Sequence, residues 1–156
     1  MQAKFCTFFA AVALLTVVSL SPAAAQDKAK WTGTWKMDSA KSQFAGGGGP
    51  TRLTIKLELK DGAVTETMTA GNDNEERAFT AIYTTDGKES TQEVMGSSQQ
   101  TTAKWEGDAL VIEFKSEGRS FRRKFTLSPD GKTMTIAAHR SGEQGEADET
   151  VVLEKQ

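Results

Sequence analysis

The chain has 156 residues, with one cysteine, one histidine and a formal net charge of −2 at neutral pH. A single cysteine excludes an intramolecular disulfide, and a single histidine excludes a multi-histidine metal site. The 19 basic and 21 acidic residues are interspersed without a basic stripe, which argues against nucleic acid as a partner.

The first 25 residues have the pattern of a cleavable export signal. Lys4 precedes an apolar stretch from Phe8 to Leu20, and the small residues Ala23–Ala25 follow. This order is typical of a signal peptide, and the apolar stretch is shorter than the ~20 residues that a membrane-spanning helix needs. We expect residues 1–25 to be removed and residues 26–156 to form one domain. The mature protein would then be periplasmic or secreted, without a membrane span.

The mature part alternates short period-two runs with turns that carry Gly beside Asp, Asn or Pro. In Arg52–Lys60 every second residue is Leu or Ile, which indicates a strand with one buried face. Asp61-Gly62 is typical of a tight hairpin turn. The expected strands span residues 31–37, 52–60, 63–70, 77–84, 91–95, 100–105, 109–115, 120–127, 133–139 and 149–154.

Three connections have features of their own. A helical turn is expected over 39–44, capped by Asp38 or Ser39. Gly46–Gly49 is not a phosphate-binding loop, because no Lys-Ser/Thr follows and a strand begins soon after. We interpret it as a flexible link that could cover an open barrel end. Residues 140–147 are expected to form a polar loop.

Short, evenly spaced strands joined by sequential hairpins favour an up-and-down meander. A meander has two unpaired edges unless its first and last strands pair, and closure removes that liability. The sequence therefore predicts an all-β fold: an antiparallel up-and-down barrel of about eight to ten strands. The Trp-rich first strand would pair with the Val-Val-Leu segment at the end.

The segment Trp31-Thr32-Gly33-Thr34-Trp35 carries a Gly-x-Trp motif soon after the export signal. This motif resembles the opening of lipocalins. Together with the Asp-Gly-Lys turns at 86–88 and 130–132, it is similar to small exported bacterial lipocalin-like (calycin-type) β-barrel proteins. The resemblance implies a barrel with one closed end, loops at the other and room for an apolar ligand. It also implies that Trp35 packs across the closed end beneath a late-strand arginine, either Arg123 or Arg140.

Arg123 stands out because alternation along Phe121–Leu127 places it on the apolar face. A buried guanidinium requires a partner, and the same counting places Glu66 on an inward face. One interpretation is an anchor for a ligand carboxylate or phosphate, since arginine can bind such groups through two hydrogen bonds. The alternatives are a structural ion pair, a stack on Trp35, or a bulge that turns Arg123 outward.

Tyr83 and Trp105 are expected on inward faces near strand ends. The candidate ligand-binding residues are therefore Arg123, Glu66, Tyr83 and Trp105, with Gly33 and Trp35 as a structural motif. Small inward residues could leave space for a ligand or could pack against the phenylalanines: Ala81, Ala103 and Ala138.

No catalytic or metal-binding constellation is visible. His139 is expected to face solvent, and no nucleophile-elbow motif occurs. Asp73, flanked by Asn72 and Asn74, lacks the regular spacing of a calcium loop. We expect no enzyme, no metal and no cofactor. The sequence favours an exported protein that binds a small, largely apolar ligand inside the barrel. The alternative is an envelope interaction or structural module with a filled barrel.

Overall fold

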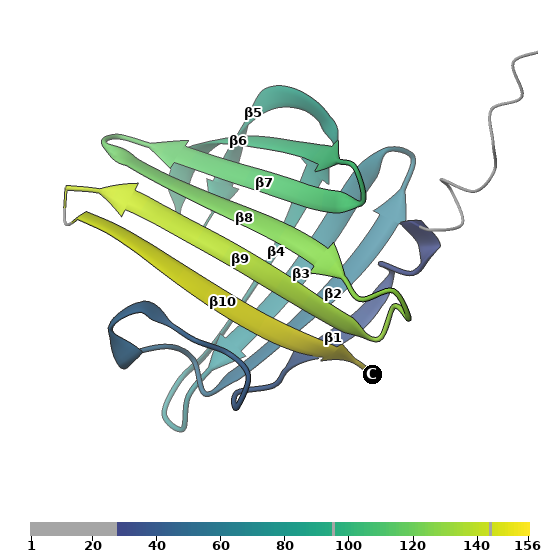
Figure 1. Ribbon diagram of the computed structural model, residues 1–156. Coiled ribbons are helices and arrows are strands. Elements are labelled where there is room, and N and C mark those ends of the chain that lie inside the picture. Colours follow the sequence, from purple (N-terminus) through teal and green to yellow (C-terminus); the bar gives the residue numbers. More distant parts are fainter. Residues whose placement is uncertain (1–27, 95, 144) are drawn as a thin grey trace, which may run out of the picture.

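Ten antiparallel strands curl into a barrel in the computed structural model, which describes residues 28–156 apart from 95 and 144 (Figure 1). The predicted export signal lies outside the described residues. Within the described part, no helix combines the length and the apolar character needed to cross a membrane.

The chain runs as a meander in which almost every strand pairs with its neighbour in sequence. Strong period-two runs bounded by turn residues account for this pattern. A single 3₁₀ turn, η1 (Ala45–Gly47), lies between the first two strands. The strands are β1 (Gly33–Met37), β2 (Arg52–Lys60), β3 (Ala63–Gly71), β4 (Glu76–Thr84), β5 (Asp86–Val94), β6 (Ser97–Glu106), β7 (Ala109–Ser116), β8 (Arg119–Leu127), β9 (Thr133–Gly142) and β10 (Gly145–Lys155).

Closure occurs between the first and the last strand, as predicted. β1 and β10 are antiparallel, with Trp35 opposite Lys155 and Met37 opposite Leu153. The ends of the ten-stranded sheet are therefore β4 and β5, which follow one another in sequence. The Gln92 side-chain amide donates to the Ile82 carbonyl at 2.5 Å, so one side chain links the two edge strands. The barrel is nearly closed, with its seam between β4 and β5.

Aromatic and aliphatic side chains fill much of the interior near one end of the barrel. The Trp35 indole is buried, and its Nε1 donates to the Trp31 carbonyl at 3.0 Å. Trp31 meets Trp105 edge-on, with ring centroids 5.1 Å apart. The carboxyl terminus and the β8–β9 loop lie at this end in Figure 1. We call this region the packed half.

The predicted turn at Asp61-Gly62 is confirmed. Both residues have positive φ, 51° and 78°, as a two-residue type I′ hairpin turn requires. Glycine adopts this conformation without strain, and Asp is among the few other residues that tolerate it.

The weak strand expected at 91–95 is present but longer than expected, because the nine-residue β5 begins at Asp86 and shows a register shift between Asp86 and Glu89. Two other expectations about local structure were wrong. The expected loop at 140–147 consists mostly of strand, because β9 and β10 stay paired up to Gly142 and Gly145. These strand ends carry polar residues on both faces, so hydrophobic alternation does not reveal them.

The predicted helical turn over 39–44 is a short turn instead. Asp38 Oδ1 accepts hydrogen bonds from the amides of Ala40 and Lys41, at 3.0 and 3.3 Å. Asp38 therefore caps this turn, as the sequence suggested. Gln43 then exchanges backbone hydrogen bonds with Thr150 of β10, which holds the chain extended and prevents a helix.

Candidate ligand chamber

The other half of the barrel encloses a cavity of about 340 Å³, which we call the chamber. It lies among inward side chains of eight strands, β2–β4 and β6–β10, and beneath two residues of the loop between β1 and β2. Apolar residues predominate, and the charged ones are Arg123 and Glu149. Its lining is Phe44, Pro50, Leu53, Met68, Ala70, Phe79, Gln99, Phe114, Phe121, Arg123, Ile136, Ala138, Glu149 and Val151.

β8 contributes inward side chains to both halves of the barrel. Phe121, Arg123 and Phe125 occupy successive inward positions. Phe125 is fully buried in the packed half, whereas Phe121 is only partly buried and lines the chamber. Arg123 lies between them, 4% exposed, at the boundary of the two halves.

Of the alternatives left open for Arg123, the structure shows the ion pair, with Glu66 as the partner. Arg123 Nη1 and Nη2 donate to the two carboxylate oxygens of Glu66 at 2.9 and 2.7 Å. The Tyr83 hydroxyl donates to Glu66 Oε2 at 3.1 Å and accepts from Arg123 Nη2 at 3.4 Å. The three residues, which we call the polar cluster, come from β3, β4 and β8, and Glu66 is 0% exposed. The guanidinium also lies 5.1 Å from the ring centroids of Phe114 and Phe125.

The electrostatics of the polar cluster follow from burial and from this contact geometry. Burial raises the pKa of the Tyr83 phenol, and although the charge of Arg123 opposes the rise, that of Glu66 adds to it. Burial alone would lower the pKa of Arg123, but the carboxylate of Glu66 outweighs it and the pKa is raised. Arg123 therefore stays charged, and Tyr83 stays a neutral donor.

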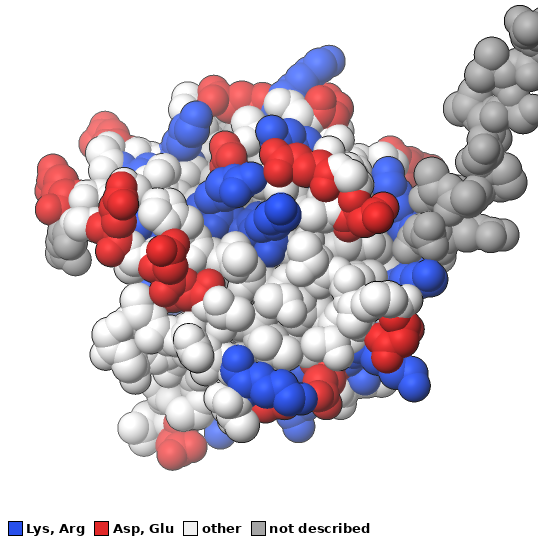
Figure 2. Space-filling model, in the orientation of Figure 1, with Lys and Arg blue, Asp and Glu red and all other residues white. Residues whose placement is uncertain are grey.

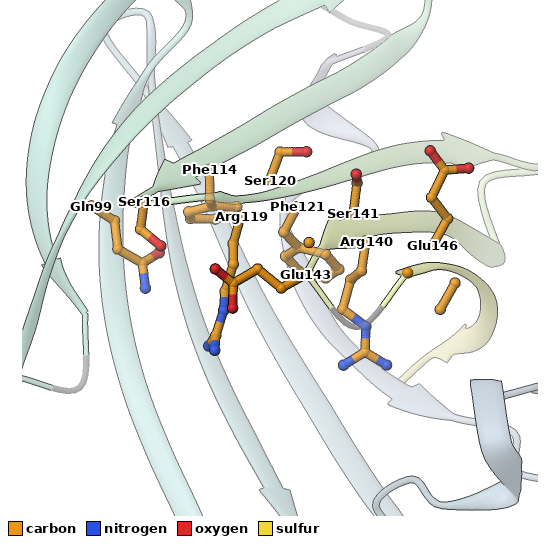
Figure 3. A pocket seen from close by; sticks show the side chains of 13 residues that line it. Gln99, Phe114, Ser116, Arg119, Ser120, Phe121, Arg140, Ser141, Glu143 and Glu146 are labelled. Atoms are coloured by element: carbon orange, nitrogen blue, oxygen red, sulfur yellow. The ribbon is translucent and has the colours of Figure 1, made fainter.

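A polar opening of about 600 Å³, which we call the mouth, adjoins the chamber (Figure 3). The two share Gln99, Phe114 and Phe121, so the mouth is contiguous with the chamber. Figure 3 shows the guanidinium groups of Arg119 and Arg140 extending in the same direction, and Glu143 and Glu146 also line the mouth. Arg140 forms an ion pair with Glu149 of β10. The mouth thus carries both signs of charge and leads to an apolar interior.

The loop between β1 and β2 contributes two of the chamber residues, Phe44 and Pro50. A Cβ added at Gly49 would overlap the Phe44 ring, so the glycine run lets this ring lie against the loop backbone. Gly48, by contrast, has open space around it. The sequence predicted a loop that could cover the open end but did not single out Phe44 or Pro50. Two apolar residues flanking a glycine run were the available signal.

Trp105 lies apart from the other three candidate ligand-binding residues. It packs against Trp31 in the packed half, with Lys28 Nζ 4.8 Å from its ring centroid. Of the four candidate residues, Arg123 lines the chamber. Glu66 and Tyr83 do not line it, but both form hydrogen bonds with Arg123. Alternation correctly placed Trp105 inward, but it did not show at which end of the barrel the residue lies.

The Gly-x-Trp motif has a structural explanation at the closed end. Lys155 Nζ lies 5.1 Å from the centroid of the Trp35 ring. A Cβ at Gly33 would come within 2.9 Å of Lys155 Cε, so the absence of a side chain at Gly33 leaves room for the Lys155 side chain. The expectation that Arg123 or Arg140 would cover Trp35 was wrong. Lys155 of the last strand covers it, because β10 pairs directly with β1.

The one histidine lies near the barrel surface. His139 is half-exposed, and its Nδ1 lies 2.8 Å from Asp148 Oδ1. Among the described residues, no group of three or more His, Cys, Asp or Glu side chains could hold a metal ion. On the face shown in Figure 2, acidic and basic side chains intermingle.

Comparison with known proteins supports the fold. No protein-family model and no curated protein sequence matches the chain. Among solved structures, it is similar to zebrafish ileal bile acid-binding protein complexed with cholic acid, with a TM-score of 0.61, 19% identity, and coverage of 81% of this chain and 99% of that one. It is also similar to Echinococcus granulosus fatty-acid-binding protein 1, with a TM-score of 0.58, 12% identity, and coverage of 81% and 98%.

A third similar structure is a secretary abundant heat soluble protein from Ramazzottius varieornatus. Its TM-score is 0.62 at 10% identity, with coverage of 81% of this chain and 96% of that one. At these identities the likeness concerns the fold. The chain has the up-and-down β-barrel fold of the fatty-acid-binding and lipocalin-like proteins.

Proposed function

We propose that this protein binds a small, largely apolar molecule inside the barrel and is a binding protein rather than an enzyme. The observation that carries the proposal is the chamber: about 340 Å³ of interior space, lined mainly by apolar side chains and contiguous with an open, polar mouth. Binding sites for small molecules typically have about 300–1,000 Å³, apolar walls and a few polar groups.

The contrast with the packed half supports the same conclusion. The same barrel fills its other end with Trp31, Trp35 and Leu57, each at most 4% exposed. Open space in a protein interior sacrifices dispersion contacts and stability. A chamber among the inward side chains of a barrel that buries these three residues so completely therefore indicates a role. The barrel's similarity to proteins named for fatty acids and a bile acid is consistent with that role.

Volume limits the ligand. At about 30 Å³ per non-hydrogen atom, the share of one water molecule in the liquid, the chamber has room for roughly eleven such atoms. A medium-length alkyl chain or a small ring system would fill it, and a longer ligand would extend into the mouth.

The protein would meet this ligand outside the cytoplasm. The export pattern of residues 1–25 supports a periplasmic or secreted location for the mature chain. Amino-terminal sequencing of the protein recovered from its host tests this part separately. A first residue at Gln26 is expected, and a retained Met1 would contradict export.

Native mass spectrometry of the undenatured protein from its host tests the binding function. We expect a bound species of low mass that is released on organic extraction. The matched control is Ala138→Phe, which adds a ring to the chamber lining and is expected to abolish the bound species. Absence of any adduct in the wild-type protein, together with failure of an uncharged fluorophore such as N-phenylnaphthylamine to bind, would contradict the function.

A further inference from the structure

The charges inside this barrel are already neutralised by the chain itself. Two charged side chains line the chamber, Arg123 and Glu149. Arg123 forms a two-point ion pair with Glu66, and Glu149 forms an ion pair with Arg140. The chamber and its ion-pair partners therefore have no net charge. A ligand that brought its own charge would lack a counterion there, and an uncompensated buried charge is costly.

One guanidinium nitrogen of Arg123 has no hydrogen bond to the described residues. Arginine has five N–H groups, and three hydrogen bonds, one from Nη1 and two from Nη2, satisfy the carboxylate of Glu66 and the Tyr83 oxygen. Arg123 Nε is buried and has no hydrogen-bond partner among the described residues. Buried polar groups are nearly always hydrogen-bonded, and an unpaired one costs stability. Arg123, which lines the chamber, thus has an unpaired donor nitrogen but no uncompensated charge.

From these two observations we propose that the ligand is uncharged and carries a hydrogen-bond acceptor, such as a hydroxyl, carbonyl or ester oxygen, that binds Arg123 Nε–H. This inference rests on the proposed binding function and specifies its ligand class. Glu66 is the residue that determines specificity, because it occupies the side of the guanidinium that would otherwise bind a carboxylate. The mouth reinforces the preference, because beyond the Arg140–Glu149 pair it adds one arginine, Arg119, and two carboxylates, Glu143 and Glu146.

The test compares two ligands of equal chain length, decanol and decanoate, that displace N-phenylnaphthylamine at neutral pH, where an ordinary carboxylic acid is ionised. In the wild-type protein we expect the Kd of decanoate to be at least about tenfold higher than that of decanol, because the anion lacks a counterion. Equal or tighter binding of decanoate would overturn the inference while leaving the binding function intact. Binding of neither ligand and of no fluorophore would instead contradict the function.

An apolar chamber of any kind would favour the alcohol to some extent, so the variant Glu66→Gln provides the decisive comparison. It frees the guanidinium of Arg123, and the ratio of the two Kd values should shift towards decanoate by about tenfold or more. The matched control is Glu113→Gln, which removes one of the two carboxylate partners of Arg122 on the outer face of the barrel. The control should keep the wild-type ratio. An unchanged ratio in Glu66→Gln would overturn the proposal.

Because Glu66→Gln leaves a buried charge unpaired, a second variant guards against a failure to fold. The double variant Glu66→Gln with Arg123→Met removes both charges and the unused donor, and replacing both partners of a buried pair is usually tolerated. We expect its affinity for decanol to fall severalfold, because the oxygen loses its donor. Decanol affinity equal to that of the wild-type protein would overturn the assignment of Arg123 Nε as the contact.

Discussion

The two halves of this barrel are built from the same strands but have different interiors. In the packed half, Trp35, Phe125 and Leu153 are each 0% exposed and fill the space between the strands. In the chamber half, Met68, Phe121 and Phe44 are only partly buried and surround about 340 Å³ of open space. Alternation alone places side chains inward in both halves. Side-chain size and packing then determine which half becomes a core and which a chamber.

The polar cluster marks the boundary between the halves. Glu66, Tyr83 and Arg123 satisfy one another at the level where the packed side chains stop. Substitutions on the two sides of the cluster, and inside or outside the barrel, should therefore have different effects.

Breaking the buried ion pair should have the largest effect on stability. Glu66→Gln leaves the guanidinium of Arg123 uncompensated, which typically costs about 3–5 kcal/mol. Urea denaturation followed by tryptophan fluorescence measures the free energy of unfolding. The matched control, Glu113→Gln, breaks a partly exposed Arg–Glu pair and should cost about 1 kcal/mol or less. Equal losses for the two variants would contradict a buried pair.

Two phenylalanines on the same strand allow the two halves to be compared directly. Phe125→Ala empties a site in the packed half and should cost about 3–5 kcal/mol of unfolding free energy. Phe121→Ala removes a side chain that already borders open space, so its cost should be at least about 2 kcal/mol smaller. Phe121→Ala should instead weaken binding of N-phenylnaphthylamine. If the two substitutions destabilise equally, the chamber half is as tightly packed as the other.

The ionisation of Tyr83 can be measured on its own, because it is the only tyrosine in the chain. Burial raises its pKa above the ordinary value of about 10. Above pH ~10 the unfolded chain has released the Tyr83 proton, whereas the folded protein still holds it. The free energy of unfolding therefore falls as the pH rises above this value. Phenolate absorbance should therefore appear only together with unfolding. A tyrosine that titrates near pH 10 in the folded protein would contradict its burial against Glu66.

The hydroxyl of Tyr83 should also make a measurable contribution to stability. Tyr83→Phe removes the hydrogen bond to the Glu66 carboxylate and is expected to cost about 1.5–3 kcal/mol, the usual range for a bond to a charged group. A loss in unfolding free energy below about 0.5 kcal/mol would show that the carboxylate is satisfied without it.

The smallest effect concerns the loop over the chamber. Gly49→Ala places a methyl group where the Phe44 ring lies, so the ring must move. We expect N-phenylnaphthylamine affinity to fall severalfold, with little change in stability. Gly48→Ala is the matched control, because nothing lies within 4 Å of its added Cβ. If the two variants bind the fluorophore equally, Phe44 does not help to form the chamber.

Much of the fold could be predicted from the sequence because apolar residues alternate with polar ones along individual strands. Leu53 to Leu59 on β2 and Phe121 to Leu127 on β8 alternate clearly, and pairing of the end strands follows from the cost of exposed edges. Placing Arg123 and Glu66 on inward faces required only counting, and the cost of a buried charge made Glu66 a candidate partner.

The rest depended on three-dimensional arrangements that no local pattern encodes. The height of a residue along the barrel depends on strand stagger, which is why Trp105 was grouped with Arg123 although it lies in the packed half. The cation over Trp35 could not be identified either, because Lys155 reaches it only through the β1–β10 register. The role of Phe44 depends on a glycine run folding back on its ring.

A crystal structure of the protein with decanol would test the central claim most directly. The account predicts an alkyl chain in the chamber, between Phe121 and Met68, with its oxygen within hydrogen-bond distance of Arg123 Nε and the Glu66–Arg123 pair intact. A chamber filled by collapsed side chains, or decanol bound only on the outer surface, would contradict the account.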